Sequence, residues 1–339
     1  MNYNKKIIKY LLVTAVIILV GIYAWQGIYL PINKNSKEEI VFSIKKGEGT
    51  KEISMNLEQE KLVRMATLFR IYTIFAGISS KLQAGEYLLS PSMAIPEIAE
   101  KFTSGEVVKE KITIIEGWTI KEIVQYLEEK GFKKEEFLEL VKEDFSGKFS
   151  FLEDKPKKLD LEGYLFPDTY YINRQRTINS EQLKELARMM LENLDKKLTP
   201  GTREEINNRG KTIFETITMA SMIEKEVKTL EDKKIVSGIL WKRLENKIPL
   251  QVDATISYII GKKSVNISVE ETKIDSLYNT YKYRGLPLGP ISNPGFESII
   301  AAIYPESSAF WYYLSTPEGE TIFSKTLEEH NIAKAKYLK

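Results

Sequence analysis

Glu224 interrupts the apolar face of a helix predicted over residues 213–227. At 3.6 residues per turn, it shares that face with apolar or small residues, namely Ile213, Ile217, Ala220, Ser221 and Val227. Burial raises the pKa of a carboxyl group, which can then hold a proton near neutral pH and act as a general acid. Glu226 follows on roughly the opposite face. From spacing alone, a Glu224 that pairs with Lys or Arg at the edge of a core helix is the simpler interpretation.

A second group of polar residues lies between residues 250 and 258. Gln251, Asp253 and Thr255 alternate with apolar residues, so an extended backbone would place all three side chains on one face. Their amide, carboxylate and hydroxyl groups are suited to hydrogen bonding with sugar hydroxyls and amides. The alternative interpretation is a solvent-facing strand edge or turn.

A third candidate is the segment 278–295, in which six of 18 residues are Gly or Pro. This share is far above ordinary usage and predicts a stiff, irregular loop, and long structured loops often carry function. Three tyrosines offer flat faces with hydroxyls, suited to carbohydrate rings: Tyr278, Tyr281 and Tyr283. The alternative is a packed connection between domains.

Composition excludes several other kinds of site. The 339 residues include 49 Lys+Arg and 47 Asp+Glu, and this near-zero net charge gives no support to nucleic-acid binding. With no Cys and only His330, thiolate nucleophiles, Cys-based metal sites and multi-His zinc sites are excluded. No metal or organic cofactor is indicated. Because no Ser or Cys elbow accompanies His330, a structural role is the preferred interpretation.

The N-terminal segment predicts a membrane anchor. Residues 1–9 include three lysines and no acid, and residues 10–33 carry no charge. As a helix this run reaches ~36 Å, longer than the bilayer core of about 30 Å. We predict a cytoplasmic tail over 1–9, a single transmembrane helix over 10–30 and an extracytoplasmic remainder. A cleaved signal peptide is the alternative, but the run is long for one and no A-x-A-like site follows. The apolar run 68–78 is too short to span and predicts a buried helix.

Residues 40–132 contain a weak internal repeat. Residues 42–53 align with 112–123 at an offset of 70 residues, and each copy predicts a strand, a Gly turn and an amphipathic helix. Residues 85–102 predict a third such unit. These units resemble a small LysM-like β/α module, which in other proteins binds aminosugar polymers. The alternative is a spacer that sets height above the membrane.

Helices dominate from residue 180 onward. Capping boxes beginning at Thr202 and Thr212 predict two helix starts, and Asn293 followed by Pro at the first helical position predicts another. Residues 310–323 predict a hairpin. Helix and strand occur without strict βαβ alternation, so the predicted class is α+β, with a larger mixed α/β domain over 133–339.

Eight blocks of residues resemble the endolytic murein transglycosylase family, the YceG-like proteins also called MltG. In family order behind an N-terminal anchor, the blocks are Glu116-Gly-Trp-Thr119, Leu161-Glu-Gly-Tyr-Leu-Phe-Pro-Asp-Thr-Tyr170, Ala220-Ser-Met-Ile-Glu224-Lys-Glu226, Gln251-x-Asp253-x-Thr255, Tyr278-Asn-Thr-Tyr281, Gly285-Leu-Pro-x-Gly-Pro-Ile291, Asn293-Pro-Gly295 and His330-Asn331. The similarity covers nearly the whole chain. Ala254 and Leu288 stand where Pro is expected, and Ile115 where Pro is common; none of these departures touches an ionisable group.

The resemblance implies a lytic transglycosylase that cuts peptidoglycan glycan strands from within, between N-acetylmuramic acid and N-acetylglucosamine. It places the catalytic glutamate at the first Glu of Ala-Ser-x-x-Glu-Lys-Glu, which is Glu224. Glu224 would protonate the glycosidic oxygen, the muramic C6 hydroxyl would attack the same sugar's anomeric carbon, and the ionised Glu224 would accept the hydroxyl proton. The product would carry a 1,6-anhydro ring, so no second carboxylate has to hold a water.

Six further residues are candidates for this site. Five would bind the glycan strand and the last would support the site: Gln251, Asp253, Tyr278, Asn279, Tyr281 and Glu162. The resemblance also implies a single-pass protein of the cytoplasmic (inner) membrane that works beside penicillin-binding synthases. Two alternatives stay open: a hydrolytic muramidase that uses Asp253 as a second carboxylate, and a non-catalytic wall-binding scaffold protein.

Overall fold

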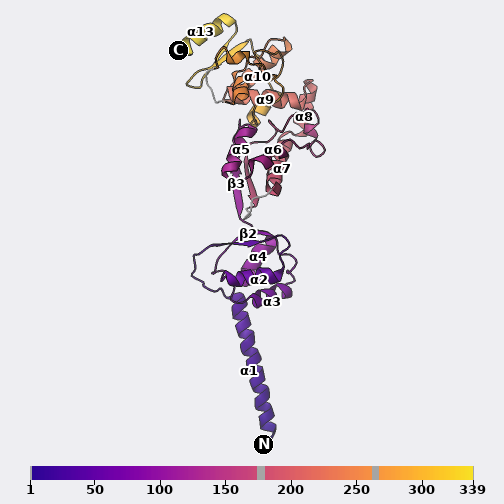
Figure 1. Cartoon of the computed structure of the whole chain (residues 1–339), viewed down its shortest axis with the longest axis vertical. Coiled ribbons are helices and arrows are strands. Elements are labelled where there is room, and N and C mark those ends of the chain that lie inside the picture. The colour runs from indigo at the N-terminus through magenta and orange to yellow at the C-terminus, as the bar shows by residue number, and fades with distance from the viewer. Residues whose placement is uncertain (1, 174–179, 262–266, 339) are drawn as a thin grey trace. The chain divides into compact units, whose positions relative to one another are not determined.

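The computed structural model describes residues 2–173, 180–261 and 267–338 (Figure 1). The chain forms two compact units. The first contains the described residues of Met1–Lys111 and Tyr171–Ile178, and the second contains those of Ile112–Tyr170 and Asn179–Lys339.

The first unit packs three short helices against a two-stranded antiparallel ribbon. Its elements are α1 (Asn2–Tyr29), β1 (Ile40–Ile44), α2 (Thr50–Gln59), α3 (Ala66–Phe75), β2 (Gly85–Leu89) and α4 (Ile95–Ser104). In the ribbon, Ile40 pairs with Leu89 and Ile44 with Gly85. The core is built around the rings of Phe42, Phe69, Tyr87 and Phe102. The strand–turn–helix units predicted at 42–53 and 85–102 are therefore confirmed.

The first helix confirms the predicted apolar segment. Within the described residues, Lys6–Tyr29 is long and apolar enough to cross a membrane by length and composition. Its last turns pack on the core of the first unit through Ala24 and Ile28. A Cβ built on Gly27 would lie 2.3 Å from Leu68 Cδ1, so glycine allows the close approach of α1 and α3.

The prediction that the apolar run 68–78 is a buried helix is wrong in one respect. The helix α3 is present and buries Leu68 and Phe69 in the core, but Phe75 is 88% exposed and Ile74 is 64% exposed. The reason is that a short helix at the edge of a small core can bury only one face.

The second unit is largely helical. Its helices are α5 (Ile120–Glu129), α6 (Lys134–Leu140), α7 (Ser180–Lys197), α8 (Pro200–Asn208), α9 (Ile213–Glu226), α10 (Leu230–Glu245), α11 (Asp253–Ile260), α12 (Phe296–Ile303) and α13 (Leu327–Tyr337), with 3₁₀ turns η1 (Ser150–Leu152) and η2 (Glu271–Lys273). Its strands form two ribbons. Strands β5 (Tyr312–Ser315) and β6 (Thr321–Ser324) pair antiparallel, and β3 (Lys109–Thr113) pairs with β4 (Thr169–Asn173). The mixed helix and strand content agrees with the predicted α+β class.

The module boundary predicted at residue 132 stays a prediction. The second repeat copy forms β3 and α5 as expected, but Ile112 and the residues after it belong to the second unit. The physical reason is that β3 pairs with β4 and not with β1 or β2. The LysM-like nature of the first unit stays a prediction.

Several predicted helix ends are confirmed and two are shifted. Thr212 caps α9 with Glu215, and residues 310–323 form the β5–β6 hairpin. The helix predicted to start at Thr202 starts instead at Pro200 behind the cap Thr199, because proline favours the first helical position. The helix predicted from Asn293 starts at Phe296, because the Asn293 side chain is used elsewhere, as described below.

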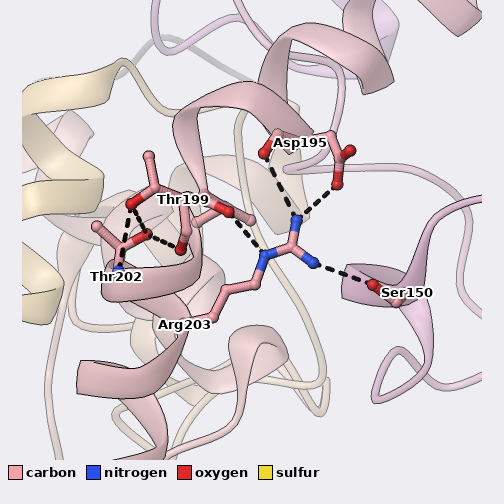
Figure 2. A network of polar contacts seen from close by, with 6 residues as sticks. Ser150, Asp195, Thr199, Thr202 and Arg203 are labelled. Carbon is pink, nitrogen blue, oxygen red and sulfur yellow. Dashed lines mark hydrogen bonds and ion pairs between the residues drawn. The ribbon is translucent and has the colours of Figure 1, made fainter.

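Arg203 joins three segments of the second unit (Figure 2). Its Nε donates to Leu198 O at 2.7 Å, its Nη1 to Ser150 Oγ at 3.0 Å and its Nη2 to Asp195 Oδ1 at 2.5 Å. The Leu198 carbonyl is one of the groups left unpaired at the end of a helix. Arg203 on α8 thereby fixes the end of α7 and the turn η1.

Gly238 is required where α10 meets the chain after α12. The N–H of Glu306 donates to Lys234 O at 2.9 Å, and a Cβ on Gly238 would lie 1.9 Å from the Glu306 carbonyl oxygen. We expect Gly238→Ala to lower the free energy of unfolding by about 1–3 kcal/mol, measured by urea unfolding. Gly201→Ala is the matched control, because nothing lies within 4 Å of its Cβ position in α8. An equal effect of both substitutions would contradict this prediction.

Candidate functional site

The last turn of α9 carries two glutamates that point to different sides. Successive side chains on a helix are about 100° apart, so Glu224 and Glu226 diverge by about 200°. Glu224 faces α12, and Glu226 faces the β5 strand and the start of α11. The helix itself is buried on all sides along Thr216–Ile223. Both glutamates are therefore held on a rigid central element.

Glu224 is an acceptor at the start of α12. Its Oε2 accepts from the N–H of Gly295 at 3.0 Å and from the Ser298 hydroxyl at 2.6 Å. The ammonium group of Lys233 lies 3.5 Å from the same oxygen, and both side chains are less than 10% exposed. Two hydrogen-bond donors and one cation thus converge on one oxygen, an arrangement that suits a carboxylate at a helix N-terminus.

Two further carboxyl groups lie near this ion pair. A Cβ on Gly295 would lie 2.1 Å from Glu116 Oε1, which shows how closely Glu116 approaches the start of α12. Burial raises the pKa of Glu116, and the charges of Glu224 and Glu297 raise it further, while Lys233 lowers it. Lys233 is therefore the cation around which these carboxyl groups gather.

Glu226 has a different environment. The Tyr313 hydroxyl and the N–H of Ala254 hydrogen-bond to its carboxyl group, and its carbonyl oxygen accepts from Ser315 Oγ at 2.9 Å. Burial raises the pKa of Glu226 to about 7, and the negative charge of Asp253 adds to this increase. A carboxyl group with this pKa carries a proton in a large fraction of molecules near neutral pH.

Three of the predicted site residues gather around Glu226. The Tyr281 hydroxyl donates to Asp253 Oδ1, and Arg243 Nη2 donates to Gln251 Oε1 at 3.0 Å. Gln251 and Asp253 are exposed, whereas Arg243 is 6% exposed. Sheltered Glu226 is therefore bordered by polar side chains that face solvent.

The predicted extended segment is wrong. Gln251 has a left-handed backbone with φ 55°, and Asp253 begins α11. Thr255 is fully buried, where its hydroxyl donates to Val252 O at 2.7 Å and lies 3.0 Å from the Thr280 hydroxyl. Thr255 therefore joins α11 to the 278–295 loop and does not face solvent with Gln251 and Asp253.

The other loop candidates organise the loop itself. Asn279 is fully buried and its amide group is used within the loop: the Nδ2 donates to Thr272 O and Ile274 O, and the Oδ1 accepts from the N–H groups of Tyr281 and Lys282. The ring of Tyr278 packs on Tyr258, with centroids 5.0 Å apart. The Asn279 side chain therefore holds the backbone of Tyr281 in place.

Glu162 is a buried acceptor away from Glu226. Both of its carboxyl oxygens lie 3.0 Å from the N–H of Ile120, and Oε1 also accepts from Asn293 Nδ2 at 3.0 Å. Burial raises the pKa of Glu162 to about 8. These contacts give Glu162 a supporting position at the start of α5.

Asn293 connects Glu162 with the region of Glu224. Its Oδ1 accepts from the N–H groups of Gly163 and Leu165, and its Nδ2 donates to Trp118 O. Its backbone N–H also donates to Trp118 O at 2.8 Å. Two residues later, Gly295 donates to Glu224. One buried amide thus fixes three loops that are distant in sequence.

His330 has a structural environment. Its ring stacks on the Tyr312 ring, with centroids 5.3 Å apart. The guanidinium carbon of Arg243 lies 5.5 Å from the centroid of the same Tyr312 ring. Burial lowers the pKa of His330 to about 4, with smaller contributions from Lys334 and Arg243. Within the described residues, no group of His, Asp or Glu side chains is placed to hold a metal ion.

Several residues of these two clusters escaped the sequence analysis. Tyr313 and Arg243 contact the Glu226 group, and Lys233 and Ser298 bind Glu224. None of the four was a candidate, because each joins its cluster through contacts between segments that are distant in sequence. The Glu-Lys-Glu spacing was the one available signal, because it places a second carboxyl group on the same rigid turn.

Comparison with known proteins identifies the family to which the chain belongs. The sequence model of the YceG-like family matches residues 42–336. The chain belongs to the YceG-like family. A *Bacillus subtilis* relative named endolytic murein transglycosylase is 33% identical over 320 residues, which cover 91% of this chain and 87% of the relative.

Two further matches extend the comparison of this YceG-like chain. A *Streptococcus pneumoniae* D39 protein of the same name is 32% identical over 357 residues, covering 96% of this chain but 64% of the pneumococcal protein. A crystal structure of a putative yceG-like protein from *Listeria monocytogenes* is 33% identical, with a TM-score of 0.57, and covers 88% of this chain and 100% of that one. The YceG-like fold therefore extends over most of the chain.

Proposed function

We propose that this YceG-like chain is a membrane-anchored endolytic lytic transglycosylase that cleaves the bond between N-acetylmuramic acid and N-acetylglucosamine in peptidoglycan glycan strands. The names of its relatives support the reaction class. The observation that carries the proposal is a sheltered carboxyl group, Glu226, whose pKa of about 7 suits proton donation and acceptance at neutral pH.

The proposed reaction needs one carboxyl group. Protonated Glu226 donates its proton to the glycosidic oxygen as the bond to the muramic anomeric carbon breaks. The C6 hydroxyl oxygen of the same muramic residue then bonds to that carbon, and the Glu226 carboxylate accepts the hydroxyl proton. The products are a new sugar hydroxyl and a 1,6-anhydro end, and no water is consumed. Gln251, Asp253 and Tyr281 would bind the strand beside Glu226.

Glu226 replaces Glu224 as our preferred proton donor. The sequence resemblance pointed to Glu224, and that prediction stays untested. The contacts favour Glu226, because the Oε2 of Glu224 already accepts from Gly295 and Ser298 and lies 3.5 Å from the ammonium group of Lys233. We propose that Glu224 positions the end of α9 against α12. Tyr278, Asn279 and Glu162 are proposed to support the site, since their contacts lie within the protein.

Incubation of the full chain with uncrosslinked glycan strands, followed by mass spectrometry of the ends, tests the proposal. Anhydro products are expected, and each is lighter by one water than the corresponding hydrolysis product. Hydrolytic ends would favour the muramidase with Asp253 as second carboxylate. Binding of the strands without shortening would favour the wall-binding scaffold.

Asp253 contributes, after burial, to the pH range of the proposed reaction. Its negative charge raises the pKa of Glu226, so removing that charge should lower this pKa. We expect the basic limb of the kcat/KM profile, near pH 7 for the unmodified chain, to move to lower pH in Asp253→Asn, because Glu226 loses its proton earlier. A profile measured from pH 4 to 9 checks this. An unmoved limb, or one shifted to higher pH, would contradict it.

The location is also part of the proposal. We propose that α1 spans the cytoplasmic membrane once, with residues 1–9 in the cytoplasm and the remainder outside, where peptidoglycan lies. The length and apolar composition of Lys6–Tyr29 support the span, and the lysines before it support the orientation. Penicillin-binding synthases are the proposed partners, because such an anchor would hold the enzyme near newly made strands.

A further inference from the structure

Helix α3 presents an apolar face that the first unit leaves uncovered. We define the α3 face by its three exposed apolar residues: Ile71, 39% exposed, Ile74, 64% exposed, and Phe75, 88% exposed. The spacing of three and four residues places them together on one side of the helix. Apolar side chains that are exposed side by side, and not singly, typically mark a surface that contacts a protein or a membrane.

The contacts of α3 with α1 place this face at a defined height along the anchor. Gly27 of α1 meets Leu68, and the Tyr23 hydroxyl lies 3.8 Å from Met65 Sδ. These contacts fall in the last turns of the apolar segment Lys6–Tyr29. A bilayer core of about 30 Å takes about 20 helical residues, so a core that begins at Tyr10, after the last lysine of the cytoplasmic tail, ends close to Tyr29. The start of α3 therefore lies at the level of the outer bilayer boundary.

The charges around the α3 face match a membrane surface. Between residues 61 and 85, the chain carries four basic residues and no acidic residue: Lys61, Arg64, Arg70 and Lys81. Arg70 is exposed on the same helix as the apolar face. Apolar side chains flanked by Lys and Arg are typical of helices that lie in the interface and contact anionic headgroups.

We propose that α3 lies in the outer surface of the membrane, with Ile71, Ile74 and Phe75 inserted among the lipid chains and the surrounding basic side chains at the headgroups. This inference rests on the proposed anchoring by α1 and does not depend on the proposed glycan cleavage. It adds a second membrane contact to the first unit. The single helix α1 could rotate freely about its axis, whereas α3 would fix the orientation of the first unit on the bilayer.

Site-directed spin labelling of the full chain in lipid nanodiscs tests the proposal. The chain has no Cys, so single substitutions give single labels. Phe75→Cys reports on the α3 face, Ile17→Cys on the anchor, and Lys46→Cys on an exposed turn after β1. Nanodiscs of phosphatidylethanolamine and phosphatidylglycerol supply the bilayer. The accessibility of each label to oxygen, which concentrates in lipid, is compared with its accessibility to a water-soluble nickel chelate.

We expect the labels at positions 75 and 17 to favour oxygen and the label at 46 to favour nickel. If the label at 75 reacts with nickel as the label at 46 does, while the label at 17 stays protected, the α3 proposal alone is overturned. Protection of position 75 from both reagents would indicate a protein partner and would also overturn it. Nickel access at position 17 would overturn the anchor, and with it this inference, but would leave the glycan cleavage proposal intact.

Discussion

Glu226→Gln is expected to lower the rate of glycan cleavage by roughly 10²- to 10⁴-fold, the usual contribution of general acid–base catalysis. Glutamine has nearly the same shape as glutamate and can still accept from Tyr313 and from the N–H of Ala254. It cannot donate a proton to the glycosidic oxygen and then take one from the C6 hydroxyl. The substitution also removes the repulsion with Asp253, so we expect the fold to be retained.

The measurement uses the full chain, uncrosslinked glycan strands and initial rates of formation of anhydro ends. Circular dichroism and thermal unfolding establish that Glu226→Gln is folded. Glu224→Gln makes the same chemical change two residues away, and the double variant with Lys233→Met, argued below, separates its effect on stability from any effect on cleavage. A Glu226→Gln variant with the rate of the unmodified chain would refute the assignment of Glu226.

The positions of the helices could be predicted from sequence more completely than their surroundings. The Thr212 capping box and the hairpin over 310–323 depend on residues close together in sequence, and both are present. The start of α8 was predicted three residues too late, because Thr199, and not Thr202, supplies the cap. These elements depend on hydrogen bonds between residues that are close together in sequence, so a local motif is enough to predict them.

The choice between the two glutamates could not be made from helical periodicity. That argument assumes one buried face and one solvated face, which led to Glu224 as the sheltered acid. In the structure, α9 is buried all round from Thr216 to Ile223, so the opposite face is also covered. Whether a carboxyl group on such a helix meets Lys233 or Tyr313 depends on residues far away in sequence.

The prediction for α3 was wrong because the sequence does not show how large the core is. Its apolar sequence suggested full burial, but the small core of the first unit covers only the side that carries Leu68 and Phe69. In the same way, the alternation of Gln251, Asp253 and Thr255 suggested a strand, but α11 begins at Asp253. Periodicity identifies which residues share a face; the partner of each face is decided by the tertiary fold.

Glu224→Gln is expected to lower the stability of the protein strongly. Lys233 is 3% exposed, and its ammonium group lies 3.5 Å from Glu224 Oε2 and 4.0 Å from Glu297 Oε2. Glutamine can still accept from Gly295 and Ser298, but it leaves the buried ammonium group without its main counter-charge. Breaking a buried ion pair in this way typically costs about 3–5 kcal/mol. We expect the free energy of unfolding to fall by about 3 kcal/mol in urea titrations, the lower end of this range because Glu297 stays nearby.

A second substitution separates a structural from a catalytic role of Glu224. In the double variant Glu224→Gln with Lys233→Met, the uncompensated ammonium group is gone, so part of the lost stability should return. Lys233→Met alone should destabilise the chain, because Glu116 and Glu224 would then lie close together without the cation that lowers the pKa of Glu116.

If Glu224 is a positioning residue, cleavage should recover in the double variant together with stability, and the pH limb set by Glu226 should stay near pH 7. If the double variant is stable yet inactive, while Glu226→Gln is active, Glu224 is the proton donor and our assignment of Glu226 fails.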